Sequence, residues 1–275
     1  MKKNAEQTKT AKSVKRRIVF FLMAVTAAAV LTGCTGKQEE AGAKNAAGGQ
    51  EEAPDRLAGQ TALERESGKD AEVDFQALQA ENPDIFAWLY VPDTGIDYPV
   101  LQSEEADDYY ESHDASGAIN ESGAIYTELA NLTNMCDFNT VLHGKTSQNG
   151  ESGLFAGLYR FADPDYFENH EYAYLYLDGN VLTYEIFVAY ERENTSLIRS
   201  YDFTYKSGCQ QFLDDLYDTR VMGMNIRKGW EEEEVTPYHF LITLTTQKGE
   251  NSENQFVVIA ALVDDAAGTI DRLVE

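Results

Sequence analysis

The stretch Ile242-Thr243-Leu244-Thr245-Thr246-Gln247 decides how the fold of this chain is interpreted. Residues 240–246 are predicted to form a β-strand. A second strand, 256–263, follows shortly and opens with Gln255-Phe256-Val257-Val258. Upstream, Val141-Leu142-His143-Gly144-Lys145 carries the end of a third predicted strand, 140–143. These three segments hold the residues on which a functional interpretation depends.

The rest of the chain from residue 73 onward is predicted to be mainly β. Tyr172, Tyr174 and Tyr176 alternate along one segment, as a half-buried strand requires, and Asp178-Gly179-Asn180 then supplies a hairpin turn. Sixteen Tyr and 13 Phe suit a pleated interior. Further strands are predicted at 87–92, 96–101, 123–127, 172–177 and 181–190. Many short strands with few helices favour a closed or nearly closed barrel, which removes exposed strand edges.

Two helices are predicted beside these strands. Val73, Phe75, Leu78 and Ile85 recur at near-helical spacing, and this helix is expected to stop before Asn82-Pro83, because a residue before proline disfavours the helical conformation. Residues 207–218 form the second, with Phe212, Leu213 and Leu216 on one side.

Several segments, in order, resemble class B sortases across roughly residues 73–265. Asn82-Pro83-Asp84-Ile85-Phe86-Ala87-Trp88-Leu89 is similar to the family's N-P-D-I-x-G-W-I, and Ile96-Asp97-Tyr98-Pro99-Val100-Leu101-Gln102 to I-D-Y-P-V-x-Q. Residues 123–128 resemble G-S-I-F-x-D, and residues 153–158 resemble the M-F-x-x-L segment. The resemblance implies a mainly β fold: an eight-stranded sortase-like barrel with an N-terminal helix and one inserted helix at 207–218.

The three active-site segments of the family also have counterparts. T-L-S-T-C resembles residues 243–247, R-x-V-V resembles 255–258, and Y-G-H resembles 143–145. In this comparison the reactive cysteine corresponds to Gln247, the histidine to Lys145 and the arginine to Gln255. Sortases cut a sorting peptide through a thioacyl-enzyme, which needs a thiolate, a proton carrier and a charged oxyanion partner. The resemblance therefore implies a catalytically inactive pseudo-sortase whose groove, marked by Lys145, Gln247 and Gln255, binds a peptide or surface-protein partner.

An alternative keeps a residual transpeptidase or hydrolase activity on cell-wall sorting signals, with a substitute nucleophile. Thr245 and Thr246 are the candidate hydroxyls, although threonine is a poor nucleophile without a placed base. His143 would face the same side of the strand as Lys145, but a strand histidine satisfied by hydrogen bonds is the simpler interpretation. Lys145 is either a solvated loop cation or a group that holds a carboxylate ligand. A third reading is a scaffolding lipoprotein that has lost the groove.

The N-terminus predicts export and lipid anchoring. Residues 1–33 combine a basic flank with a short apolar run that ends in Leu31-Thr32-Gly33-Cys34, which resembles a lipoprotein signal with Cys34 as the lipidated residue. Residues 34–72 lack aromatic residues and are predicted to be a flexible acidic tether before the domain at 73–275. We expect the protein on the outer face of the cytoplasmic membrane of a Gram-positive bacterium, attached through lipid.

Charge and cysteine content limit the partners further. The chain has a net charge of −25, and residues 34–275 alone carry 15 basic against 46 acidic residues. Such a surface disfavours nucleic-acid binding, which needs clustered Lys and Arg. No metal motif such as C-x-x-C or H-E-x-x-H occurs, and no cofactor is expected. Besides Cys34, only Cys136 and Cys209 are available for a disulfide, and their spacing leaves the pairing open.

Overall fold

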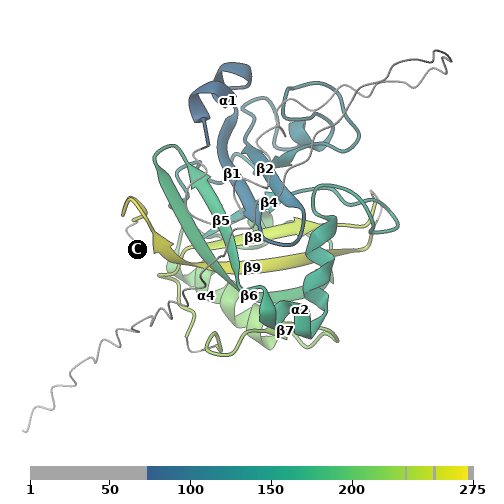
Figure 1. The fold of residues 1–275 in the computed structure, drawn as a ribbon. Coiled ribbons are helices and arrows are strands. Elements are labelled where there is room, and N and C mark those ends of the chain that lie inside the picture. Colours follow the sequence, from purple (N-terminus) through teal and green to yellow (C-terminus); the bar gives the residue numbers. More distant parts are fainter. Residues whose placement is uncertain (1–72, 233, 250–251, 272–275) are drawn as a thin grey trace, which may run out of the picture. The chain divides into compact units, whose positions relative to one another are not determined.

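The strands form a closed barrel (Figure 1). A computed structural model describes residues 73–232, 234–249 and 252–271. The predicted signal (1–33), Cys34 and the predicted tether (34–72) lie outside these residues. The strands are β1 (Ile85–Val91), β2 (Ile96–Leu101), β3 (Ile125–Tyr126), β4 (Asn139–His143), β5 (Tyr172–Leu177), β6 (Asn180–Glu193), β7 (Asn225–Ile226), β8 (Leu241–Thr246) and β9 (Asn254–Asp265).

Closure comes from one pairing. The sheet runs in the order β5-β1-β2-β3-β4-β8-β9-β6-β7, and β5 also pairs with β6, so eight strands form a ring and β7 stays outside it. The hairpin at Asp178-Gly179 makes the closing pair, with Gly179 at a φ of 74° that glycine adopts freely. The predicted eight-stranded, mainly β barrel is confirmed.

Alternation along the strands separates an inner from an outer face. In β8, Ile242 and Leu244 belong to the same apolar cluster as the inward residues of β1 and β9, whereas Leu241 belongs to the cluster outside the wall. The inner cluster includes the fully buried rings of Phe155 and Phe161. Because successive side chains point to opposite faces, Thr243 and Thr245 lie on the outer side of β8.

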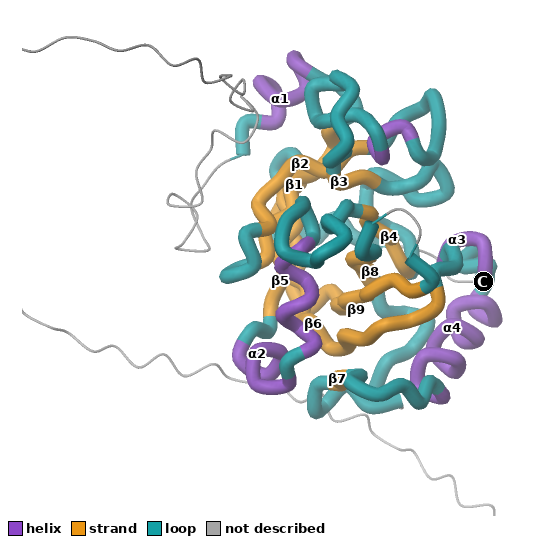
Figure 2. The backbone as a smooth tube through the Cα atoms, turned by 90° about the vertical axis from the view of Figure 1, so that its right-hand side faces the viewer, coloured by secondary structure: helices purple, strands orange, loops and turns teal. Residues whose placement is uncertain are grey.

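Helices cover the outer face at two places (Figure 2). Helix α1 (Phe75–Glu81) begins at Asp74, whose carboxylate accepts from the backbone N–H of Ala77, and packs Phe75 and Leu78 beside β1 and β2. Helix α4 (Lys206–Asp218) packs its apolar side against the outer residues of β4, β8 and β9. Both predicted helices are confirmed, except that Ile85 begins β1 rather than continuing the helical pattern.

Short helical segments were not predicted from the sequence. They are the 3-10 turn η2 (Tyr109–Glu111), the 3-10 segment η3 (Ala156–Ala162), α2 (Pro164–Asn169) and α3 (Leu197–Ser200). The inserted helix expected at 207–218 is α4, and these shorter segments accompany it. Segments of three to seven residues show too few turns for a helical period to stand out.

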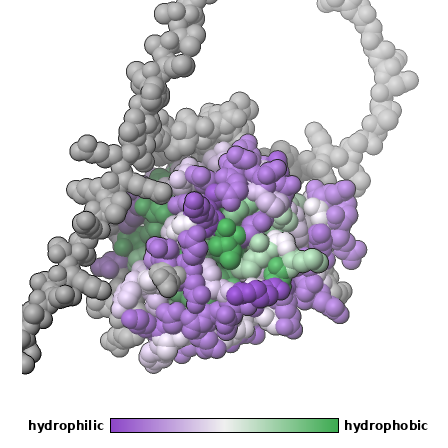
Figure 3. All heavy atoms as spheres, turned by 90° about the horizontal axis from the view of Figure 1, so that it is seen from below, coloured by the Kyte–Doolittle hydropathy of each residue, from purple (hydrophilic) through white to green (hydrophobic). Residues whose placement is uncertain are grey.

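The face that includes β7 is largely hydrophilic, with apolar side chains gathered in small patches (Figure 3). Exposed apolar residues of the adjoining segment include Val221, Met222 and Ile226. Among the described residues, no helix is long and apolar enough to span a membrane.

Candidate functional site

Lys145, Gln247 and Gln255 line one pocket on the outer wall of the barrel. Its volume is about 240 Å³. Strands β4 and β8 are parallel neighbours, so the residues that follow them emerge at the same end of the wall. Gln255 reaches this end because β9 runs antiparallel to β8. The three positions singled out in the sequence, together with His143, Thr245 and Thr246, are thus brought together.

Gly144 fixes how the chain leaves β4 at this pocket. A Cβ atom there would lie 2.6 Å from the Phe155 ring, closer than real side chains approach. Only glycine therefore lets the segment between His143 and Lys145 run directly over the aromatic core. The barrel interior and the pocket share this contact, so core packing positions the pocket-lining loop.

Gln255 is held by hydrogen bonds on every side. The Thr245 hydroxyl donates to Gln255 Oε1 at 2.6 Å. Gln255 Nε2 donates to the carbonyl oxygens of Thr195 at 2.9 Å and Glu193 at 3.3 Å. Both side chains are buried, with Thr245 4 % and Gln255 8 % exposed. Gln255 therefore ties the segment before α3 to the strand wall as a neutral polar group.

Gln247 and Lys145 stand at the mouth of the pocket. The Asn194 amide donates to Gln247 Oε1 and also to the Ser252 carbonyl at 3.1 Å, so it links two loops beside the pocket. Lys145 Nζ donates to the Glu121 carbonyl oxygen at 3.3 Å. The position that the resemblance assigns to the nucleophile thus carries a hydrogen-bonded amide.

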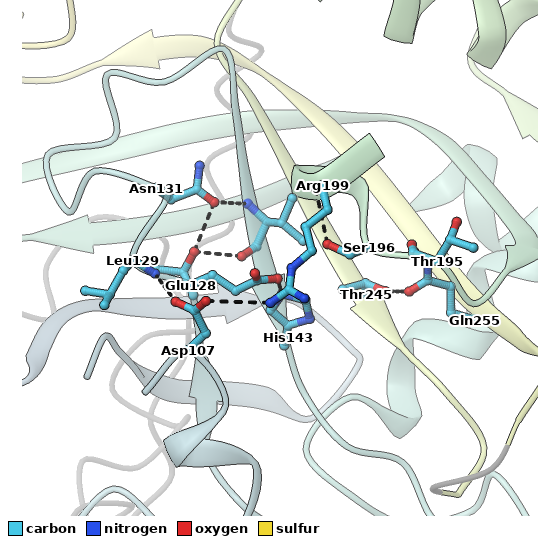
Figure 4. Close-up of polar contacts among 12 residues, drawn as sticks. Asp107, Glu128, Leu129, Asn131, His143, Thr195, Ser196, Arg199, Thr245 and Gln255 are labelled. Carbon is cyan, nitrogen blue, oxygen red and sulfur yellow. Dashed lines mark hydrogen bonds and ion pairs between the residues drawn. The ribbon is translucent and has the colours of Figure 1, made fainter. Parts of the chain in front are cut away.

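His143 lies beside the carboxylate of Glu128 (Figure 4) and is also stacked on the ring of Tyr126. Its Nε2 lies 3.3 Å from Glu128 Oε1, and its ring stacks on Tyr126 with centroids 5.1 Å apart. The hydrogen bond with His143 holds the pKa of Glu128 below its usual range, against the opposing effect of burial. The two groups form an ion pair whenever the imidazole is protonated.

The hydroxyl groups of Thr245, Thr246 and Ser252 are each engaged in a hydrogen bond within the protein. Thr246 Oγ1 lies 2.8 Å from Thr146 Oγ1, and Ser252 donates to the Asn254 carbonyl at 2.6 Å. Thr245 is engaged with Gln255, as described. His143 and Thr245 are register partners on β4 and β8, so their side chains leave neighbouring positions of one face, but the Thr245 proton is directed to an amide oxygen.

Two further pockets extend the first into a groove. One, of about 390 Å³, shares Lys145 and Gln247 with it and is lined by hydroxyl and amide side chains around Thr146. The other, of about 370 Å³, shares Tyr126 and Ser196 and lies between Glu128 and Arg199. We call these three adjoining pockets the groove. Arg199, on α3, pairs with Asp107 at 3.8 Å at its far end (Figure 4).

Metal and disulfide chemistry have no support at this site. Within the described ranges, no group of three or more His, Cys, Asp or Glu side chains is arranged to hold a metal ion. Cys136 and Cys209 are both free thiols, and Cys209 lies on the buried side of α4, where its thiol donates to the Phe203 carbonyl at 3.4 Å. Neither cysteine lines a pocket of the groove.

Some residues of the groove were missed by sequence reasoning. Asn194, Thr195, Ser196 and Arg199 come from the connection between β6 and α4. Glu128 is the last residue of the family-like segment 123–128, and nothing in its local sequence marks it as a groove residue. Loop residues give no periodic signal, and their approach to β8 depends on tertiary packing. The polar run Asn194-Thr195-Ser196 before an apolar turn was the available hint, because Ser196 caps α3.

Comparison with known proteins points to one family. No family model matches the chain. Sortase B of Listeria monocytogenes is 28% identical over 188 residues, which is 68% of this chain and 72% of that protein. Sortase B of Staphylococcus aureus is 26% identical over 193 residues, covering 69% and 74%. The crystal structure of Clostridium perfringens sortase B superposes with a TM-score of 0.59 at 26% identity, covering 69% of this chain and 99% of that one.

The fold and these likenesses define a sortase-like protein. They support the class B sortases as its family, in agreement with the resemblance seen in the sequence.

Proposed function

We propose that this chain is a membrane-anchored, extracytoplasmic class B sortase-like protein that is catalytically inactive and binds a peptide or surface-protein segment in the groove. The observation that carries the proposal is the open pocket shared by Lys145, Gln247 and Gln255. This pocket opens on the wall of a sortase-like barrel, and the three positions contribute two amides and an ammonium group to its lining.

The side chains at the three family positions support the proposed absence of acyl transfer. An amide nitrogen has no usable nucleophilic lone pair, so Gln247 cannot form an acyl intermediate. Lys145 stands where the resemblance places the histidine, and its amino group donates to the Glu121 carbonyl oxygen at 3.3 Å instead of offering an imidazole. Gln255 offers hydrogen bonds without charge. Catalytic groups that act together lose most of the rate when even one of them is missing. If all three are missing here, acyl transfer is not expected.

The size and polarity of the groove support binding. Its pockets measure about 240 to 390 Å³ each, close to the lower range of ligand sites, which is about 300 Å³. Hydroxyl, amide and backbone groups line it, and such groups suit an extended peptide. The predicted lipid on Cys34 would hold this groove near the membrane surface, where exported chains pass.

A peptide titration tests the proposal. A panel of fluorescein-labelled eight-residue peptides, built from Ser, Thr, Asn and Gln with varied end residues, is titrated against the purified protein by fluorescence anisotropy. At least one peptide is expected to bind saturably. Gln247→Trp should abolish binding by filling the pocket mouth, whereas Lys228→Trp, at an exposed position after β7, should leave it unchanged. No binding at millimolar protein would remove the proposal.

One arrangement favours a second candidate, a residual hydrolase or transpeptidase. Glu128, His143 and Thr245 form a row of carboxylate, imidazole and hydroxyl at one end of the wall. Intact-mass measurement after incubation with the panel would detect an acyl adduct, and Thr245→Val should remove it. The Thr245 proton is already committed to Gln255, so we expect a clean negative beside an active sortase control.

A further inference from the structure

We infer that the ligand of the groove is a peptide that carries a lysine or arginine side chain at the end of the groove beside Tyr126. This inference rests on the proposed peptide binding and adds the chemistry of the partner. The argument comes from the unequal chemistry of the two ends of the groove.

The end beyond Lys145 is polar and nearly balanced in charge. Its lining combines hydroxyl and amide side chains with the backbone of two glycines, one ammonium group on Lys145 and one carboxylate on Glu121. Neutral polar peptide residues match such a surface through hydrogen bonds. Nothing in this lining selects a net charge, because the two charged groups have opposite signs.

The end beside Tyr126 is acidic. Asp107, Asp108, Glu111 and Glu128 all act on the Tyr126 hydroxyl, and together with burial, the largest cause, they raise the pKa of Tyr126. Three of these carboxylates belong to the segment before β3, and the fourth, on Glu128, follows β3 by two residues. Glu111 lines the central pocket, while the other three line the far one. A ligand that crosses from one pocket to the other therefore passes four carboxylates.

Only part of this negative charge is balanced within the described residues. Arg199 pairs with Asp107 at 3.8 Å, with 75 % and 42 % of the two side chains exposed, and such exposed pairs are weak. Glu128 faces His143 at 3.3 Å. For Asp108 and Glu111, neither an ion pair nor a side-chain hydrogen bond joins them to another described residue. Charge complementarity at this end therefore favours a cation.

Tyr126 gives that cation a surface to rest on. One side of its ring stacks on His143 with an interplanar angle of 24°, and the ring lines both the central and the far pocket. A lysine or arginine head within about 6 Å of an aromatic face gains from the ring quadrupole, and the stem packs along the ring. The junction of the two pockets thus offers an aromatic face and surrounding carboxylates in one place.

The test compares matched peptides. The lysine probe is a fluorescein-labelled eight-residue peptide of Ser, Thr, Asn and Gln with lysine at one end, made once for each end, and the glutamine probe has glutamine in place of lysine. Binding is measured with the purified protein at low and at physiological salt. We expect one lysine probe to bind about 10-fold more tightly than the glutamine probe at low salt, with a smaller ratio at higher salt because ions screen the carboxylates.

A variant pair locates the effect. Asp108→Asn with Glu111→Gln should bring the lysine probe to the affinity of the glutamine probe. Glu168→Gln with Asp178→Asn removes the same charge from exposed positions on α2 and the β5–β6 turn, and should preserve the preference. Equal affinity of all probes for the wild-type protein would overturn the inference but leave peptide binding standing. A preference that survives in the first variant would also overturn it, while failure of every probe to bind would instead remove the proposed function.

Discussion

The interior of the barrel and the groove on its outer wall are built from different chemistry. Inside, apolar side chains such as Phe155, Phe161 and Leu244 are fully buried and contact one another by close packing. In the groove, Gln255 and Thr245 are almost as buried but are polar, and each is satisfied by hydrogen bonds. Residues in the interior hold the fold, whereas the groove carries the polar side chains on which the proposed peptide binding rests. The proposed function requires that a sortase-like barrel can persist without the chemistry of a sortase.

The largest effect on stability is expected inside. Phe155→Ala would leave a cavity against Gly144 and the β4 end, and should lower the free energy of unfolding by about 3–5 kcal/mol. Denaturant unfolding followed by circular dichroism measures this change. A loss of less than about 1 kcal/mol would mean that the site can collapse, contrary to close packing around the ring.

A smaller effect is expected where the interior supports the groove. The buried Asn131 side chain donates to the Asn139 carbonyl at 2.9 Å and accepts from the Val141 N–H at 3.0 Å, so it pins a loop to β4. Asn131→Ala leaves these groups without partners and should cost about 2–3 kcal/mol by the same unfolding measurement. The exposed Asn134→Ala in the same loop is the control, and an equal loss in both would contradict this assignment.

The contact between Glu128 and His143 makes a pH-dependent contribution to the free energy of unfolding. Because the folded-state pKa of Glu128 is lowered, its contribution to stability is present above the ordinary carboxyl pKa and is lost as the pH falls through the folded value. We expect Glu128→Gln to cost about 1 kcal/mol at pH 6 and to cost progressively less as the pH drops below about 4.5. Thermal unfolding across pH 3–7 measures the difference, and a constant difference over that range would contradict the pairing with His143.

The smallest effect on stability is expected at Gln247. Its side chain stands at the pocket mouth and contacts Asn194, so Gln247→Ala should change the free energy of unfolding by less than about 0.5 kcal/mol. A loss above 2 kcal/mol would show that Gln247 is a structural residue. It would contradict the view that stability comes from the barrel interior rather than from the mouth of the groove.

Much of the barrel was predictable because its strands repeat with period two and end in turns. The segments 172–177 and 96–101 match β5 and β2 fully. Ile85 was assigned to a helical pattern, because an irregularity between Ile85 and Ala87 interrupts the alternation of β1. The convergence of Lys145, Gln247 and Gln255 followed from family resemblance, since the pairing of β4 with β8 joins segments about a hundred residues apart. Glu128 and Arg199 entered the groove through loop packing, which no local pattern reveals.

The most direct test of a groove that binds without reacting is one titration read in two ways. The lysine probe with the higher affinity is incubated with the purified protein, its binding is followed by anisotropy, and the masses of peptide and protein are then measured in the same sample. We predict saturable binding with both masses unchanged after prolonged incubation. A cleaved peptide, an acylated protein, or no binding at all would contradict the account.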